Sequence, residues 1–145
     1  MRAYLFDIDG TLANGEHRLH HILKQPKDWD TFFSLCHLDE PIAHIVQLCK
    51  DLHASGAAIV YVSGRSDVAR EQTIEWIKRH DLPIAPLFMR KAGDRTDDNI
   101  LKIKMLEEVI WHGFEPIMVF DDRNRVVEAW RSNGIPCAQV APGNF

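Results

Sequence analysis

Two aspartates separated by one residue lie near the start of the sequence, in the segment Phe6–Thr11 (FDIDGT). If this segment is extended, Asp7 and Asp9 point to the same side. Two such carboxylates can act as nucleophile and general acid/base, or can share a cation. Gly10 allows a sharp turn after them, and Thr11 offers a hydroxyl and a backbone N–H to an anion. The pattern is also typical of a capping Asp-x-Asp-Gly turn, so alone it leaves both interpretations open.

A second acidic pair, Asp121 and Asp122, directly follows the apolar run Pro116–Phe120. Charge placed beside a buried strand is costly unless a cation or another partner neutralises it. Carboxylate oxygens from two neighbouring strands are ligands that suit Mg²⁺. The pair therefore indicates a magnesium site shared with Asp7, although Asp122 could also cap a helix that begins near Arg123.

A possible phosphate site follows another apolar run, at Ser63, Gly64 and Arg65. A serine hydroxyl and the first amides of a helix can bind a phosphate, but Ser63 or Ser66 could equally be a simple helix cap. A carboxylate that attacks a phosphate dianion meets like charge, at roughly 4 kcal/mol per unit pair for about 4 Å and an effective dielectric of about 20. Magnesium and Lys102, on a predicted helix, can remove most of that penalty, unless Lys102 is merely a solvated helix lysine.

The elements that must position these residues are visible as five strand-length apolar runs: Ala3–Phe6, Ala57–Val62, Pro86–Met89, Pro116–Phe120 and Cys137–Val140. Nearly continuous apolar segments such as AAIVYV and PIMVF are typical of strands buried on both faces of a parallel sheet. Their alternation with helical patterns predicts an α/β, Rossmann-like three-layer sandwich with a five-stranded parallel sheet. Functional groups gather beyond the carboxyl ends of such strands, so the acids and the serine should meet at one edge.

Four apolar helical faces fill the intervals between the predicted strands. They consist of Ile42, Ile45, Val46, Leu48 and Cys49; of Val68, Ile74 and Ile77 with Trp76 beside them; of Ile100, Ile103, Leu106 and Ile110; and of Val126, Val127 and Trp130. The segment 13–40 is irregular, and we expect a loop there with one short helix around Trp29–Leu35. No interval has room for a substantial cap domain, so we predict a single domain over residues 1–145.

The composition limits the class of protein. Apolar residues make up 46% and charged residues 26% of 145, which is typical of a folded domain. The net charge of −4 disfavours a protein that wraps long nucleic acids, but it allows recognition of a strand end. The three cysteines form no CxxC pair, which indicates free thiols. The first apolar run is too short for a signal peptide or a membrane span, and we expect a cytoplasmic protein.

In order along the chain, FDIDGT, VSGR, a helix lysine and FDDR resemble the four motifs of the haloacid dehalogenase (HAD) superfamily of phosphohydrolases. Nearly the whole sequence is also similar to the 3′-phosphatase domains of bacteriophage polynucleotide kinase–phosphatases, in LANGEHR, VYVSGR, GDRTDDNILK and FDDRNRVVEAW…APGNF. The resemblance implies a Mg²⁺-dependent phosphomonoesterase with an aspartyl-phosphate intermediate, which removes 3′-phosphate from DNA or RNA ends. No Walker-type GxxxxGK[ST] motif occurs, so we expect no kinase activity from this chain.

The resemblance also implies a role for each site residue. Asp7 is the nucleophile, and Asp9 protonates the leaving oxygen and then activates water. Ser63 and Lys102 hold the phosphate. The implied metal ligands are Asp7, the backbone carbonyl of Asp9, Asp121 and Asp122. Further active-site positions match Arg18, Arg65 and Asp98, although the loop after Ala13 departs from the family pattern.

Weaker signals have simpler interpretations. The histidines of HRLHH could suggest a metal site, but without paired cysteines or an HExxH pattern they indicate a solvated or phosphate-facing loop. Trp29, Phe32 and Phe33 could stack on a base, yet aromatic residues in a helix more often belong to the core. Arg90 and Lys91 could touch a substrate backbone or lie in a solvated loop.

Two alternative functions stay open at this point. One is an HAD phosphatase that acts on a nucleotide or another small molecule, although a site without a cap favours a polymer end. The other is a non-catalytic phosphate-receiving signalling domain, which also carries acids, a lysine and a hydroxyl at strand ends. Spacing argues against the second, because a receiver has its acid pair on the first strand and its acceptor on a middle strand.

Overall fold

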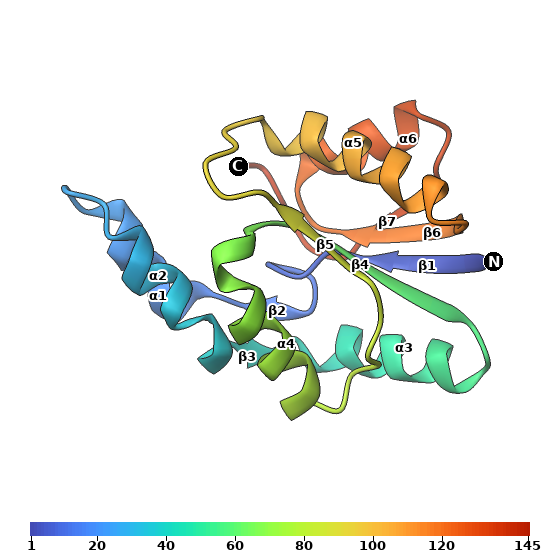
Figure 1. The fold of residues 1–145 in the computed structure, drawn as a ribbon, viewed down its shortest axis with the longest axis horizontal. Helices are drawn as coiled ribbons and strands as arrows, with labels where there is room; N and C mark the ends of the chain where they lie inside the picture. Colours follow the sequence, from blue (N-terminus) through green and yellow to red (C-terminus); the bar gives the residue numbers. More distant parts are fainter.

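A computed structural model describes all 145 residues. Its centre is a sheet of five parallel strands in the order β5-β4-β1-β6-β7, with β1 in the middle (Figure 1). The strands are β1 (Arg2–Phe6), β4 (Ala58–Ser66), β5 (Leu87–Arg90), β6 (Glu115–Asp121) and β7 (Cys137–Gln139). The five strands and the parallel sheet predicted from the apolar runs are confirmed.

Helices cover both faces of this sheet (Figure 1). One face carries α3 (Ala43–Ala54) and α4 (Arg70–Arg79), and the other carries α5 (Asp98–Trp111) and α6 (Asn124–Ser132). Because successive strand residues point to opposite faces, Leu5 belongs to the core under α5 and α6 while Phe6 belongs to the core over α3 and α4. The three-layer α/β sandwich is therefore confirmed.

The register brings the carboxyl ends of β1 and β6 to one level, beside a β4 that continues to Ser66. Phe6 of β1 is paired with Tyr61 of β4 and with Phe120 of β6, so Asp7 and Asp121 follow side by side. Numbered along the chain, the sheet reads 3-2-1-4-5, the doubly wound order. Phosphate-receiving domains of the CheY type read 2-1-3-4-5. The sheet order therefore overturns the receiver-domain alternative.

Two of the predicted helix faces are wrong in part. In α5, Ile100 and Ile110 are half exposed, at 50% and 53%, and the buried side is shifted by one position. It consists of Leu101, Lys102, Met105, Leu106 and Val109. The helix carries apolar residues on more than one side, so their periodicity does not show which side faces the sheet. The side that faces the sheet is the one that carries Lys102. Val68 is also exposed, because it lies in the 3₁₀ turn Asp67–Ala69 ahead of α4.

The segment between β1 and α3 holds more structure than predicted. It contains α1 (Glu16–Leu23) and α2 (Trp29–Ser34), the 3₁₀ turn Cys36–Leu38, and the short antiparallel pair β2 (Ala13–Asn14) and β3 (Glu40–Pro41). The helix near Trp29 is confirmed, but HRLHH forms α1 and not a loop. This small lobe projects beyond α4 (Figure 1). The expected absence of a substantial cap domain agrees with its size.

None of the helices combines the length and hydrophobicity that crossing a bilayer requires.

Candidate active site

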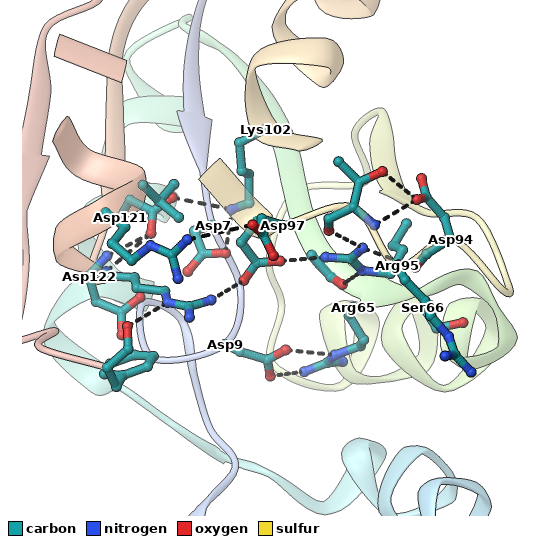
Figure 2. A pocket seen from close by; sticks show the side chains of 18 of the residues that line it. Asp7, Asp9, Arg65, Ser66, Asp94, Arg95, Asp97, Lys102, Asp121 and Asp122 are labelled. Carbon is teal, nitrogen blue, oxygen red and sulfur yellow. Dashed lines mark hydrogen bonds and ion pairs between the residues drawn. The ribbon is translucent and has the colours of Figure 1, made fainter. Parts of the chain in front are cut away.

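A buried lysine joins the two acidic pairs at the carboxyl end of the sheet. Lys102 Nζ lies 2.8 Å from Asp7 Oδ1, 3.2 Å from Asp121 Oδ2 and 2.9 Å from the carbonyl oxygen of Val62. All three charged side chains are almost fully buried. Figure 2 shows Lys102 reaching from its helix toward Asp7 and Asp121. The inference that Lys102 is a site residue and not a solvated lysine is thus supported by its position.

Three carboxylates at this end could hold a metal ion. One oxygen from each of Asp7, Asp121 and Asp122 lies within 4.8 Å of the others, and all three residues are buried. Asp122 does not cap α6, whose first turn has no side-chain cap. Hard oxygen ligands in this arrangement suit Mg²⁺. The donor set therefore fits the predicted cation.

The acids at the centre of the site hold protons more strongly than ordinary carboxylates. Burial, and then the charge of Asp121, raises the pKa of Asp7 well above its usual value, although Lys102 opposes this. The same two causes raise the pKa of Asp122 to about 6. Burial would lower the pKa of Lys102, but Asp121 and Asp7 outweigh it and raise that pKa. Like charges crowded in a buried site are stabilised by a cation.

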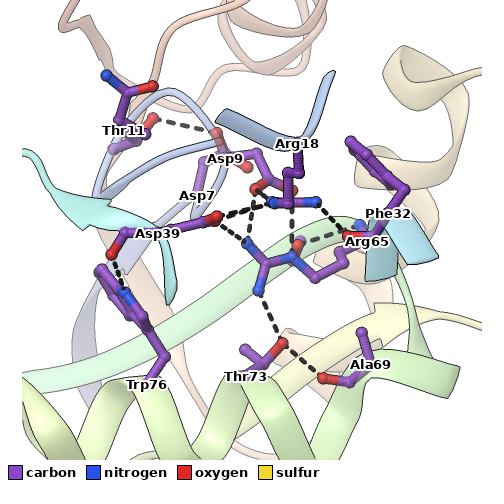
Figure 3. A network of polar contacts seen from close by, with 12 residues as sticks. Asp7, Asp9, Thr11, Arg18, Phe32, Asp39, Arg65, Ala69, Thr73 and Trp76 are labelled. Carbon is purple, nitrogen blue, oxygen red and sulfur yellow. Dashed lines mark hydrogen bonds and ion pairs between the residues drawn. The ribbon is translucent and has the colours of Figure 1, made fainter. Parts of the chain in front are cut away.

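Asp9 faces the same cavity but is held by two arginines. Arg65 donates to both its oxygens, with Nη2 2.6 Å from Oδ1 and Nε 3.2 Å from Oδ2, and Arg18 Nη2 lies 2.9 Å from Oδ1 (Figures 2 and 3). Desolvation alone would raise the pKa of Asp9, but the charges of Arg65 and then Arg18 hold it below its usual value. The side chain keeps 44% exposure, so a substrate can reach it.

Asp39, which the sequence analysis did not select, organises these arginines (Figure 3). Arg18 binds it at two points, Nε to Oδ1 and Nη2 to Oδ2, both at 2.8 Å, and Arg65 Nη2 lies 3.3 Å from Oδ2. Its backbone carbonyl accepts a hydrogen bond of 2.7 Å from the indole of Trp76 on α4. No acidic pair or motif marks Asp39, because its role depends on contacts distant in sequence.

The expected phosphate seat at Ser63–Arg65 differs from the prediction. β4 continues through Ser66, and α4 begins only at Arg70, so no helix opens at Gly64. The pairing of β4 with β5 shifts register between Ser63 and Ser66, and this irregularity lies next to the site. Ser63 is fully buried, and its hydroxyl accepts from the backbone N–H of Arg65 at 3.1 Å. Gly64 and Arg65 themselves line the cavity.

Two residues of FDIDGT support the acids and do not face a ligand. Thr11 is fully buried, its hydroxyl donates to Asp7 Oδ2 at 3.0 Å, and its N–H donates to the carbonyl of Ile8. The expectation that Thr11 offers these groups to an anion is therefore wrong. Gly10 has φ +82°, and a Cβ there would overlap the carboxylate of Asp122.

Asp98 joins two arginines at the opposite wall. Arg90 Nη2 lies 2.6 Å from Asp98 Oδ1, and Arg123 Nη1 lies 2.8 Å from Asp98 Oδ2. Arg90 also donates to the carbonyl of Gly64 on β4 and to those of Asp94 and Thr96, which lie between β5 and α5. Its guanidinium thus holds the loop between β5 and α5 against β4. Lys91 is exposed and does not line the cavity. Of the two residues suggested to touch a substrate backbone, Arg90 lines the cavity and Lys91 does not, while Arg95, which was not selected, lines it as well.

The cavity has a volume of about 730 Å³ and unites most of the expected residues. Those that line it are Asp7, Asp9, Gly64, Arg65, Asp98, Lys102, Asp121 and Asp122. Thr11, Arg18 and Ser63 lie behind its wall. It is also lined by Trp29, Phe32 and Phe33, and no residue of α2 is buried, so their assignment to the core is wrong.

The histidines of HRLHH do not form a metal site. His20 and His21 are neighbours on α1 with ring centroids 4.0 Å apart, and His17 Nε2 lies 2.7 Å from Asp39 Oδ1. The three carboxylates Asp7, Asp121 and Asp122 are the one metal-competent cluster in the structure. HRLHH therefore contributes to the site through Arg18, which Asp39 and Asp9 hold, and through His17 beside it.

The geometry can now be compared with known proteins. The sequence profile described as "Polynucleotide kinase PNKP phosphatase domain" matches residues 1–145. The chain belongs to this family. It is a phosphatase domain of the HAD type and hence a phosphoric monoester hydrolase. The small lobe, Asp39 and the buried Lys102 are thus parts of a PNKP-type phosphatase domain.

Two relatives are much longer than this phosphatase domain. A protein of Autographa californica nuclear polyhedrosis virus, assigned as a bifunctional polynucleotide kinase/RNA ligase, is 34% identical over 137 residues, which cover 93% of this chain and 18% of the viral protein. A chain in the structure of a Pnkp1/Rnl/Hen1 complex is 28% identical with a TM-score of 0.85, over 99% of this chain and 46% of that chain. This chain thus spans less than half the length of either relative.

A more distant structure shares the fold. The class C acid phosphatase from Bacillus anthracis with tungstate bound is 15% identical, with a TM-score of 0.68 over 97% of this chain and 68% of that one. At this identity the likeness concerns the fold alone. It agrees with the HAD-like arrangement of sheet and helices described above.

Proposed function

We propose that residues 1–145 act as one Mg²⁺-dependent polynucleotide 3′-phosphatase domain, with Asp7 as the nucleophile. The observation that carries this proposal is the contact of Lys102 with Asp7 at the base of a cavity that also exposes Asp9. The relatives support the choice of substrate, because their descriptions name a polynucleotide kinase/RNA ligase and a Pnkp1/Rnl/Hen1 complex. A nucleic-acid end also suits a cavity that no cap domain closes.

In the proposed first step an oxygen of Asp7 attacks phosphorus, and the bond from phosphorus to the leaving oxygen breaks. Asp9 gives its proton to that oxygen, and the phosphoryl group stays on Asp7 as an aspartyl-phosphate. In the second step Asp9 takes a proton from water, which attacks the phosphoryl group and restores Asp7. Atoms and protons balance over the two steps, because Asp9 recovers the proton that it gave.

The metal would be held by Asp7, Asp121 and Asp122, with the backbone carbonyl of Asp9 as a further ligand. When bound, Mg²⁺ supplies positive charge that offsets repulsion between the phosphate and these carboxylates. Lys102 orients Asp7 and adds a second positive charge. Arg65 is placed to exchange Asp9 for a phosphate oxygen, and Arg18 and Ser63 support it from behind the wall.

Phosphate release from three substrates tests the proposal. A short 3′-phosphorylated oligonucleotide should have a higher kcat/KM than a mononucleotide 3′-phosphate, because extra backbone contacts add binding energy. The same oligonucleotide with a 5′-phosphate is the matched control and should be a poor substrate. If the mononucleotide is preferred, or both ends are cleaved equally, the protein is instead a nucleotide phosphatase.

A further inference from the structure

The aromatic residues of α2 form one wall of the cavity that holds Asp7. The rings of Trp29 and Phe33 are stacked, with centroids 5.7 Å apart and an interplanar angle of 25°, and Phe32 meets Trp29 edge-on. All three line the cavity, and Trp29 keeps 46% of its surface exposed. Such a cluster of large apolar side chains beside solvent marks a contact surface and not a core.

This aromatic wall is held in a fixed position relative to the catalytic acids. The guanidinium of Arg18 lies 4.3 Å from the centre of the Phe32 ring, and the same guanidinium binds Asp9 and Asp39 (Figure 3). At the start of α2, the carboxylate of Asp28 accepts from both the N–H and the hydroxyl of Thr31, at 3.1 and 2.7 Å. The rings therefore need no large rearrangement to meet a ligand, which reduces the cost of binding.

The remaining surface of the cavity indicates what the ligand carries. Arg95, Arg123 and Arg125 line the cavity along with the aromatic wall. The cavity volume of about 730 Å³ is much more than a phosphate group occupies. A ligand that fills it must combine a phosphomonoester at Asp7 with a flat apolar group beside the rings and further negative charge. The terminal nucleotide of a nucleic acid strand has these three features.

We propose that Trp29 and Phe33 form a stacking site for the unpaired base of the terminal nucleotide of a single-stranded nucleic acid. The inference deepens the proposed 3′-phosphatase function and rests on it. Every base has an aromatic face, so the site tolerates any sequence and selects for a strand end that is not base-paired. Arg95 contacts the backbone beyond that nucleotide.

The test compares two 3′-phosphorylated oligonucleotides that differ only in the terminal nucleotide, which carries a base in one and is abasic in the other. Stacking on an aromatic side chain is worth about 1–3 kcal/mol per base, so the wild-type protein should prefer the complete end in kcat/KM by about 5- to 140-fold. In Trp29→Ala this preference should largely disappear, because the variant and the abasic end remove the same contact.

Two further variants serve as controls. Trp111→Ala removes an exposed tryptophan, 85% accessible, from the outer side of α5, and it should keep the full preference. Trp29→Phe keeps a ring and should keep most of it, which also covers the case in which Trp29→Ala fails to fold.

The outcomes separate this inference from the proposed function. If the wild type cleaves both oligonucleotides equally well, the stacking site is disproved while the 3′-phosphatase activity stands. If the preference survives in Trp29→Ala, the base lies elsewhere and the inference fails as well. If neither 3′-phosphate is released, the proposed function fails, and the inference that rests on it fails too.

Discussion

Arg65 holds Asp9 at two points, with Nη2 2.6 Å from one carboxylate oxygen and Nε 3.2 Å from the other. This contact keeps the pKa of Asp9 low, whereas a general acid must carry a proton when the leaving oxygen departs. The proposed mechanism therefore requires Arg65 to turn from Asp9 to the phosphate when the substrate binds. Until then, the contact keeps Asp9 ionised.

Replacement of Arg65 should change both the rate and its pH dependence. We expect Arg65→Gln to lower kcat by roughly 10²- to 10³-fold, through lost charge at the transferring group. Without the guanidinium the pKa of Asp9 rises, so the fall of kcat/KM with increasing pH should begin at a higher pH. Rates measured across the pH range at saturating Mg²⁺ check this. If kcat/KM begins to fall at the same pH in the variant and the wild type, Asp9 is not the general acid.

Replacement of the nucleophile should abolish turnover without unfolding the protein. Asp7→Asn is nearly isosteric, but an amide cannot form the acyl-phosphate, so we expect a loss of roughly 10³-fold or more. Ionised Asp7 is disfavoured by burial and by Asp121, so the metal-free variant should be as stable as the wild type or more stable. Single-turnover kinetics and thermal unfolding measure the two effects. Sustained turnover by the purified variant would exclude Asp7 as the nucleophile.

The acidic cluster should link metal, pH and stability. The folded-state pKa of Asp122, about 6, exceeds the value of 3.8 for a free side chain, so its contribution to the stability of the metal-free protein decreases as pH rises through this interval. Mg²⁺ requires the ionised form, so its Kd should be lower at about pH 7.5 than at about pH 5, and one fixed Mg²⁺ concentration should stabilise the protein more at the higher pH. The gain is about 2.7 kcal/mol when that concentration is 100 times the Kd. Melting curves with Mg²⁺ or with a chelator measure this difference.

Activity provides an independent check on the same site. It should vanish in excess chelator and return with Mg²⁺, whereas Ca²⁺ should support it poorly, because calcium prefers more ligands and a looser geometry. In the melting experiment described above, Mg²⁺ should raise the melting temperature of Asp122→Asn by an amount that depends less on pH than in the wild type. Full activity after exhaustive chelation would remove the metal from the mechanism.

Asp39 should matter for stability as much as for catalysis. Asp39→Asn leaves the buried guanidiniums of Arg18 and Arg65 without this counter-charge, and breaking a buried ion pair costs about 3–5 kcal/mol. Asp51→Asn is the matched control, because Asp51 is exposed and its side chain accepts a hydrogen bond only from Gln47. Urea unfolding compares the two. Equal midpoints would show that Asp39 does not organise the arginines.

Two arginines near the cavity should behave differently on truncation. Arg90→Ala removes the donor to the carbonyls of Gly64, Asp94 and Thr96 and should destabilise the protein by about 1–3 kcal/mol. Arg95→Ala should change stability by less than about 0.5 kcal/mol, but it should raise KM for an oligonucleotide and reduce its dependence on salt. Unfolding curves and KM values at two salt concentrations separate the two roles. A stable Arg90→Ala protein with a raised KM would assign substrate contact to Arg90.

The sequence was sufficient to predict the sheet and the base of the site. Strands buried on both faces are nearly continuous apolar runs, and the acids at the ends of β1 and β6 mark where those runs stop. The sequence therefore places Asp7 and Asp121 together, whereas Lys102 was selected as a positive charge that could offset theirs and through the family resemblance. The helices that cover the sheet, α3 to α6, could be predicted from the apolar patterns in the intervals between the strands.

The parts that sequence could not predict depend on tertiary contacts. Asp39 has no local signal, because its partners Arg18 and Arg65 lie 21 and 26 residues away. The aromatic residues of α2 follow a pattern that suits a core equally well, and only the position of the small lobe exposes them. Histidines and a long polar stretch obscured α1, which packs against α2 and holds Arg18.

The central position of β1 has a consequence for how the protein folds. Asp7 and Lys102 are 95 residues apart in sequence, and Asp9 and Arg65 are 56 apart, yet each pair is in contact. Contacts this distant require large loops to close, which slows folding of parallel sheets. During synthesis, the chain must grow past β6 before β1 has both of its neighbours. The catalytic groups are therefore assembled late in folding, and shorter nascent chains should be inactive.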